Sequence, residues 1–149
     1  MNLRSHSHCV YNLQYHLVLV TKYRKKCLTT ELMQRMKEIV EEQCQHWDIE
    51  LIEFGGEADH IHLLLSMHPN IMPSRFINSL KTVSSRYLRK EFSAHLKKYF
   101  WKPVLWTRAY CLLTTGGATI ETIRQYIEKQ GSDSSPSKSE ILGGEFSRG

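Results

Sequence analysis

This 149-residue sequence has no long apolar run, no closely paired cysteines and fewer acidic than basic side chains. No apolar stretch approaches the ~20 residues of a membrane-spanning helix and no signal-peptide pattern opens the chain, so we expect no membrane contact. The four cysteines are scattered without a C-x-x-C pair. This spacing argues against a four-cysteine zinc site and a disulfide framework. We therefore expect free thiols in a reducing, cytoplasmic setting.

Acidic residues are outnumbered, because 15 Asp and Glu stand against 20 Lys and Arg and leave a net charge of +5. The last 19 residues contribute −1 to this total, so the preceding part carries about +6 and favours a polyanionic partner. Six Ser, four Gly and one Pro occur among those 19 residues, a composition typical of disorder. We expect one folded domain over residues 1–130 and a disordered tail over residues 131–149.

Hydrophobic periodicity predicts the order strand, helix, strand, strand, helix, strand, followed by one more helix. A period of two predicts strands over 10–21, 49–54 and 106–114, and a further strand that begins at His60. Helical spacing predicts helices over about 30–47, 73–92 and 120–130. Two β-α-β halves joined in this way predict a ferredoxin-like, RRM-like α+β fold. Its βαββαβ antiparallel sheet would have the first and third strands at its centre, two helices on one face and an additional C-terminal helix.

Two histidines bracket one aliphatic residue in the motif His60-Ile61-His62. Side chains alternate faces along a strand, so the two imidazoles share one face while Ile61 and the aliphatic residues after it anchor the other. Two imidazoles side by side suit one metal ion. Two histidines that merely face solvent are an equally open alternative. A second match, at residues 6–8, lies in a polar segment that we interpret as a surface tail.

Basic side chains gather in two places. One is a five-residue run in which a tyrosine interrupts four cations, an arrangement that suits phosphates and a stacked base. The other is the helix predicted from Pro73, where Glu91 is the one acidic residue before Phe92. A solvated surface is the alternative for both. The candidate nucleic-acid-binding residues are Lys22, Tyr23, Arg24, Lys25, Lys26, Arg86 and Arg89.

The last predicted helix places Tyr126 and Gln130 on one face, because they are four residues apart. Three isoleucines, at positions 120, 123 and 127, already give this helix a buried stripe. Tyr126 is therefore not required for packing, although an aromatic side chain packed against the core remains an open alternative.

Together, the strand histidines, the Tyr-x-x-x-Gln pair, the basic segment and the ferredoxin-like order resemble the HUH single-tyrosine transposases of the TnpA type, which move insertion sequences as single-stranded DNA. The resemblance covers about residues 8–130. It implies that Tyr126 is the catalytic tyrosine. It also implies that His60, His62 and Gln130 bind a divalent metal ion, Mg²⁺ or Mn²⁺.

The implied function is the cutting and rejoining of single-stranded DNA at hairpin-bearing insertion-sequence ends through a 5′-phosphotyrosine intermediate. The resemblance also implies a homodimer with composite sites, in which the tyrosine helix of one subunit meets the histidines of the other, and no small-molecule substrate. A repeat-associated relative, or a nickase or relaxase with the same motif, is one alternative. A non-catalytic ferredoxin-like nucleic-acid-binding module is another, although the His60 strand lacks the aromatic rings of an RNA-binding sheet.

Overall fold

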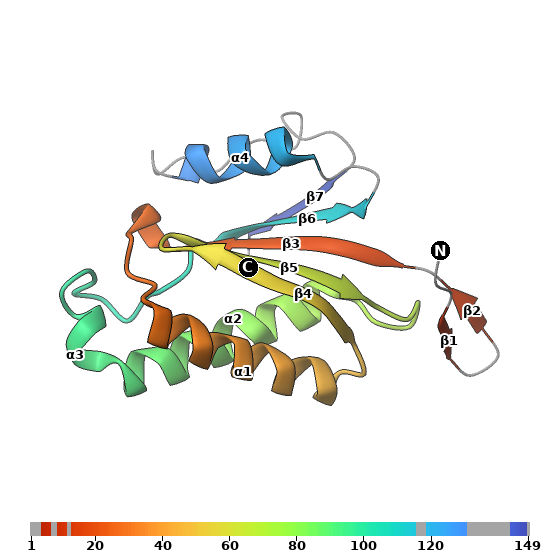
Figure 1. Ribbon diagram of the computed structural model, residues 1–149, viewed down its shortest axis with the longest axis horizontal. Coiled ribbons are helices and arrows are strands. Elements are labelled where there is room, and N and C mark those ends of the chain that lie inside the picture. The colour runs from red at the N-terminus through yellow and green to blue at the C-terminus, as the bar shows by residue number, and fades with distance from the viewer. Residues whose placement is uncertain (1–3, 7–8, 12, 116–118, 131–143, 149) are drawn as a thin grey trace.

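The computed structural model describes residues 4–6, 9–11, 13–115, 119–130 and 144–148. A five-stranded antiparallel sheet with the order β4-β5-β3-β6-β7 forms its centre (Figure 1). The strands are β3 (Gln14–Val20), β4 (Glu50–Glu57), β5 (His60–Ser66), β6 (Ala109–Thr114) and β7 (Gly144–Arg148). The helices are the 3₁₀ turn η1 (Lys22–Arg24), α1 (Thr30–His46), α2 (Pro73–Glu91), α3 (Ser93–Leu96) and α4 (Ile120–Lys129).

The order of β3, α1, β4, β5, α2 and β6 confirms the predicted βαββαβ arrangement. β5 and β3, the third and first strands of this unit, lie between β4 and β6, as predicted. Figure 1 shows α1 and α2 together on one face of the sheet and α4 on the other. The chain therefore folds as three layers, and the sheet is covered on both faces.

The main core lies between the sheet and the pair α1–α2. Leu17 and Leu19 of β3 and Ile61 and Leu63 of β5 are at most 1% exposed and belong to this core. Alternation along the strands then directs His60 and His62 to the opposite face, toward α4. The aliphatic half of the His-Ile-His motif thus fixes the direction of its histidines.

Local signals explain where the two long helices begin. The hydroxyl of Thr29 accepts a hydrogen bond from the Leu32 N–H at 3.2 Å and caps α1. Pro73 is the first residue of α2, a position whose N–H has no acceptor within the helix, so proline loses no helical hydrogen bond there. Helical spacing predicts Tyr87 on the inward face of α2 and Lys81 on the opposite side, but Lys81 is buried while Tyr87 is 43% exposed. The Lys81 Nζ donates a 2.8 Å hydrogen bond to the Arg108 carbonyl, which makes this burial possible.

The β4–β5 hairpin is tighter than predicted. We expected residues 55–59 to link the strands, but β4 continues through Gly55 and Gly56 to Glu57. The Gly56 Cα pairs with that of Ile61, and a Cβ at Gly56 would lie only 2.8 Å from the Ile61 Cα. Glycine therefore allows the ladder to reach the turn beside His60.

Other predicted ends also differ. β6 begins at Ala109, and Trp106 forms only an isolated bridge with Thr21. Whereas we predicted a disordered tail after Gln130, residues 144–148 form β7 and pair with β6. Pairing satisfies backbone groups that β6 would otherwise leave open at the edge of the sheet, an effect that composition does not reveal.

Two further predicted segments lie wholly or partly outside the described residues. His6 belongs to β1 (Arg4–His6), which pairs with β2 (Cys9–Tyr11) in a separate hairpin, whereas residues 7–8 are not described. Residues 116–118, most of the predicted joint before α4, and residues 131–143 and 149 of the tail are likewise not described. Within the described chain, no helix combines the length and the apolar character needed to cross a membrane.

Candidate active site

The face of the sheet under α4 collects the predicted site residues. In the ladder between β3 and β5, Val20 pairs with His60 and Val18 pairs with His62. Val18 and Val20 belong to one buried apolar cluster with Tyr126 and Ile127 of α4. The strand histidines and Tyr126 therefore lie on the same face of the sheet.

His60 has a defined hydrogen-bond partner. Its Nδ1 lies 2.8 Å from Oδ1 of Asp59, and the other carboxylate oxygen accepts a 2.9 Å hydrogen bond from the Arg24 Nε. A carboxylate can only accept, so Nδ1 of His60 bears the proton and Nε2 keeps a lone pair for a metal ion. Burial alone would raise the pKa of Asp59, but the bonds from His60 and Arg24 outweigh it and hold that pKa below its usual value.

The backbone around Asp59 is held in place by the segment that follows β3. The Thr21 N–H donates to the Asp59 carbonyl at 3.0 Å, while the Thr21 hydroxyl donates to the Lys25 carbonyl at 2.6 Å and lies 3.1 Å from the Asp59 carbonyl. The Leu28 N–H donates to the Ala58 carbonyl at 2.9 Å. The turn that carries Asp59 is thereby bonded to Thr21 and Leu28, the residues on either side of the basic run, and this restricts the position of His60.

His62 contacts a third histidine, His16 of β3. The His16 Nδ1 lies 2.7 Å from the His62 Nε2, and the rings are within 6° of parallel with centroids 4.9 Å apart. Such a short nitrogen–nitrogen contact with widely separated centroids means that the rings meet edge to edge. A metal ion bound through Nε2 of His62 would displace His16, whereas one bound through Nδ1 would keep it as the orienting partner.

Both members of this pair favour the neutral imidazole. Burial lowers the pKa of His62, and the nearby His16 and His60 rings lower it further, against an opposing effect of Glu53. Burial also lowers the pKa of His16. Neutral imidazole is the form that binds metals, so His62 needs no deprotonation at neutral pH.

Tyr126 of α4 and Gln130, the C-cap of this helix, are both buried, with exposed fractions of 2% and 5%. Burial raises the pKa of the Tyr126 phenol, and Cys111 raises it further, while a hydrogen bond with the Thr107 side chain lowers it. In the part of the chain that is described, the Gln130 Nε2 is buried without a hydrogen-bond partner. The Tyr126 phenol is therefore held in its neutral form, and the Gln130 Nε2 has no acceptor for its hydrogens among the described residues.

Among the described His, Cys, Asp and Glu side chains, one group could hold a metal ion through three ligand atoms. These atoms belong to Glu57, Asp59 and His60 and lie within 4.8 Å of one another. The group shares His60 with the predicted ligand set. The structure thus places carboxylates beside one predicted ligand, and His62 lies outside this group.

The predicted DNA-binding residues fall into two separate places. Residues 22–26 lie beside the Asp59 turn, and Tyr23 is 47% exposed with Lys22 Nζ 5.2 Å from its ring centre. Arg86 and Arg89 belong to α2, on the other side of the sheet. The structure therefore does not gather all seven residues into one patch around the histidines.

Sequence patterns did not identify His16 and Thr107 as parts of this site. A period of two places His16 on the same face as Val18 and Val20, so its orientation could be predicted. Its contact with His62 could not, because neither strand encodes the register between them. Thr107 precedes β6 and carries no periodic signal.

Comparison with known proteins identifies the chain's relatives. Residues 9–130 match the family described as IS200-like transposases. The chain is 36% identical to the ISDra2 transposase TnpA of Deinococcus radiodurans over 121 residues, and this alignment covers 81% of this chain and 86% of that protein. It is 32% identical over 127 residues to the transposase for insertion sequence element IS200 of Salmonella typhimurium, covering 85% and 82% of the two chains.

Solved structures show the same relationship. A crystal structure of a candidate transposase from Deinococcus radiodurans R1 superposes with a TM-score of 0.78 at 35% identity and covers 85% of this chain and 97% of that one. A REP-associated tyrosine transposase bound to a REP hairpin has a TM-score of 0.54 at 9% identity, covering 83% and 69%. The second likeness concerns the fold alone.

The family match and these relatives show that the chain is a DNA endonuclease and strand transferase of the transposase class. The chain belongs to the IS200-like transposase family. Membership of this family implies a divalent metal ion and DNA as the partner.

Proposed function

We propose that this transposase cuts and rejoins single-stranded DNA at insertion-sequence ends, with Tyr126 as its nucleophile and with His60, His62 and Gln130 as its metal ligands. One observation supports the assignment above all others. Tyr126 belongs to the same buried cluster as Val18 and Val20, the two residues that pair with His62 and His60 in the sheet. The face of the sheet that carries the two histidines is therefore a face on which a tyrosine helix can dock, whether that helix comes from the same chain or from a partner subunit.

The proposed ligands fit a divalent metal ion by their donor atoms. His60 keeps Nε2 available because Nδ1 is bonded to Asp59, and the lowered pKa of His62 leaves its ring neutral. Gln130 would bind through its amide oxygen, because its buried Nε2, which has no partner among the described residues, carries hydrogens and can only donate. Two imidazoles and an amide leave coordination positions for phosphate oxygens and are compatible with Mg²⁺ or Mn²⁺. When bound, such an ion polarises the scissile phosphate and neutralises developing charge.

The covalent step is an exchange of one phosphodiester for another. The Tyr126 Oη attacks phosphorus, a tyrosyl oxygen–phosphorus bond forms, and the bond from phosphorus to the 3′ oxygen breaks. The phenol proton is lost, and the departing 3′ oxygen gains a proton to become a hydroxyl. The 5′-phosphotyrosine keeps the energy of the original bond, so rejoining by attack of a 3′-OH requires no nucleotide triphosphate.

The burial of Tyr126 bears on how the site is completed. A phenol that is 2% exposed, with its pKa raised by burial, cannot reach a phosphate until α4 is displaced. The described residues of α4 contact the sheet through a small cluster that is separate from the main core. We propose that α4 exchanges between two subunits of a homodimer, so that each site combines Tyr126 of one chain with the histidines of the other.

We propose single-stranded DNA with hairpin ends as the substrate. The basic run at residues 22–26 lies beside the turn that orients His60, so a strand held there would lead toward the metal ligands. Tyr23 is half exposed and can stack on a base, while the neighbouring cations meet phosphates. DNA binding should therefore weaken steeply as the salt concentration rises.

The test follows covalent attachment to labelled single-stranded DNA on a denaturing gel. We expect Tyr126→Phe to bind DNA but to form no covalent product, and the double variant His60→Ala, His62→Ala to lose metal-dependent cleavage. A mixture of the two inactive chains should recover activity after subunit exchange if the sites are composite. A covalent product from Tyr126→Phe would refute the nucleophile, and an inactive mixture with verified exchange would refute the composite site.

A further inference from the structure

Trp101 is the most exposed large apolar side chain in the described chain, with 89% of its surface accessible. Its neighbours in sequence are anchored, because Phe100 is 6% exposed and its N–H donates to the Leu96 carbonyl at 3.0 Å. Leu105, four residues later, is 1% exposed. The backbone is therefore held from both sides while the indole remains in solvent, where a ligand can reach it.

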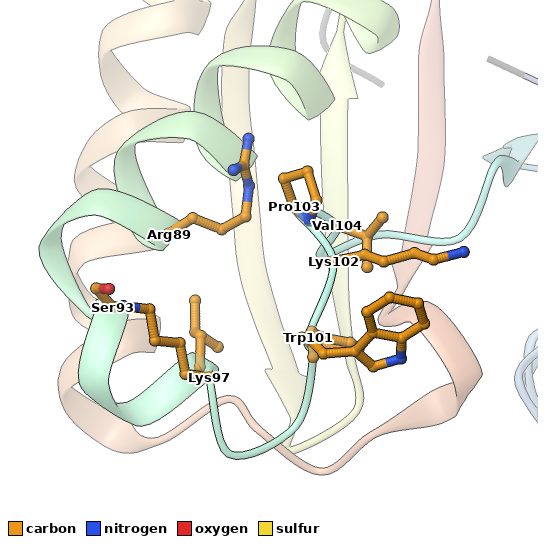
Figure 2. A pocket seen from close by; sticks show the side chains of 9 residues that line it. Arg89, Ser93, Lys97, Trp101, Lys102, Pro103 and Val104 are labelled. Carbon is orange, nitrogen blue, oxygen red and sulfur yellow. The ribbon is translucent and has the colours of Figure 1, made fainter.

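Two hollows meet at this tryptophan, and no acidic residue of the described chain lines either of them. The first, of about 320 Å³, extends from Trp101 to Arg89 and Lys97 (Figure 2). The second, of about 410 Å³, extends from Trp101 to Lys22 and Tyr23. Figure 2 shows the side chains of Trp101 and Lys102 on the same side of the loop, away from Arg89 and Lys97.

The second hollow joins two segments that are far apart in the sequence. The Lys22 N–H donates a 2.7 Å hydrogen bond to the Leu105 carbonyl, which fixes η1 beside the loop of Trp101. Lys22 Nζ lies 5.2 Å from the Tyr23 ring centre, and Lys102 Nζ lies 4.8 Å from the Trp101 ring centre. Each exposed ring is thus accompanied by a lysine ammonium group.

We infer that this hollow, which we call the Trp101 pocket and define by Lys22, Tyr23, Lys25, Tyr99, Trp101 and Lys102, binds an unpaired nucleotide of single-stranded DNA. The Trp101 indole stacks on the base, and the lysines contact the flanking phosphates. A volume of about 410 Å³ lies within the range of small-ligand pockets and suits one nucleotide. This inference rests on the proposed DNA function and adds a subsite to it.

The pocket selects unpaired over paired bases for a geometric reason. Bases within a duplex have both faces covered by their neighbours, so a side chain cannot stack on them without unstacking the helix. A single strand exposes both faces at little cost. The Trp101 pocket therefore distinguishes single-stranded DNA from duplex, while its lysines alone would bind either form.

Binding is measured with a labelled oligothymidylate of about 20 nucleotides and with a duplex of the same length. The full chain carries Tyr126→Phe, and no metal is added, so that no covalent product forms. We expect Trp101→Ala to weaken binding of the single strand by about 5- to 100-fold and to leave binding of the duplex unchanged. Trp101→Phe should retain most of the affinity, because it keeps an aromatic ring.

Two controls separate stacking from charge and from exposure. Lys102→Ala should lower the salt dependence of single-strand binding by about 0.7 in log–log slope, whereas Trp101→Ala should leave it unchanged. Tyr87→Ala removes an exposed aromatic residue of α2 outside the pocket and should bind normally. Trp47 packs edge-on against Phe76 and Trp106 is buried, so quenching of tryptophan fluorescence by DNA should disappear in Trp101→Phe.

The inference is overturned if Trp101→Ala binds the single strand as the parent does, if it loses duplex binding equally, or if Trp101→Phe binds as weakly as Trp101→Ala. Thermal unfolding of each variant should match the parent, because the indole is outside the core. If the wild-type chain still forms its covalent product while Trp101→Ala binds normally, the subsite alone is wrong. If the parent does not bind single-stranded DNA at all, the subsite and the proposed substrate fail together.

Discussion

Replacing Asp59 with asparagine should weaken both the fold and the metal site. The two carboxylate oxygens accept from the Nδ1 of His60 at 2.8 Å and from the Nε of Arg24 at 2.9 Å. Asparagine offers one acceptor and one donor, so either amide orientation sets its NH₂ group against an N–H. We therefore expect Asp59→Asn to leave one of the two donors without its hydrogen bond.

The size of the effect follows from burial. Asp59 is 5% exposed, and loss of a hydrogen bond at a buried group costs about 1–3 kcal/mol of the free energy of unfolding. The Arg24 side chain is 36% exposed and screened by solvent, so most of this cost arises at His60. A metal-binding histidine that loses its orienting partner typically loses 10- to 100-fold in metal affinity, and we expect a loss of about that size.

The stability difference also has a defined dependence on pH. The pKa of Asp59 is lowered in the folded protein, so its ionised form contributes stability above the usual carboxyl pKa of 3.8. That contribution is lost as the pH falls through the still lower pKa of the folded state. The difference between wild type and Asp59→Asn should therefore be full at pH 7 and shrink in this acidic range.

Two measurements test this expectation, urea unfolding and titration with Mn²⁺ followed by electron paramagnetic resonance. Glu57→Gln is the matched control, because it removes an exposed carboxylate from the same turn and should change the free energy of unfolding by less than about 0.5 kcal/mol. Unchanged Mn²⁺ affinity in Asp59→Asn would refute the orienting role. A larger loss of Mn²⁺ affinity in Glu57→Gln would make Glu57 a direct ligand instead.

Two further predictions concern the frame around the site. Gly56→Ala should lower the free energy of unfolding by about 1–3 kcal/mol, because φ is +154° and the new Cβ would lie 2.8 Å from the Ile61 Cα. Gly55→Ala, which meets nothing within 4 Å, should be nearly neutral in the same urea unfolding experiment. Burial lowers the pKa of Lys81 to about 8, so wild type should gain up to about 3 kcal/mol relative to Lys81→Met between pH 8 and 10.5, and a constant difference would contradict this pKa.

The sequence allowed prediction of the elements whose signals are local. Alternation around His60-Ile61-His62 correctly placed one aliphatic face in the core, and helical spacing from residue 30 and Pro73 correctly placed the starts of α1 and α2. The βαββαβ order followed from the succession of these elements. Each of these features depends on residues within one turn or one strand of each other, which is why a single chain suffices to predict them.

Features that depend on contacts between distant segments could not be predicted in this way. The His16–His62 contact needs the register of β3 against β5, and the Trp101 pocket needs η1 to meet a loop about 80 residues away. The burial of Lys81 likewise depends on the Arg108 carbonyl. In each case no local sequence pattern marks the side chain, and its role depends on a contact with a residue that is distant in sequence.

The structure also connects the two halves of the proposed site through a short hydrogen-bonded path. Tyr23 and Arg24 have φ values of +59° and +56°, a conformation that costs a residue other than glycine about 1–3 kcal/mol. The Arg24 N–H donates to the Thr21 carbonyl at 2.8 Å, and its side chain bonds Asp59, so these contacts hold the unfavourable backbone in place. The same backbone turns the Tyr23 ring outward, where it lines the Trp101 pocket.

A strand of DNA that contacts Tyr23 therefore acts on a segment whose next residue is bonded to the partner of His60. If DNA binding shifts this turn, Arg24 and Asp59 move with it, and the His60 ring follows because its Nδ1 has no other acceptor within the described chain. Binding of DNA and binding of the metal ion are then coupled, and the coupling is reciprocal by thermodynamic necessity. Arg24→Ala should accordingly reduce the effect of single-stranded DNA on Mn²⁺ affinity, whereas Lys26→Ala should only weaken DNA binding; equal coupling in both variants would show that no signal passes through Asp59.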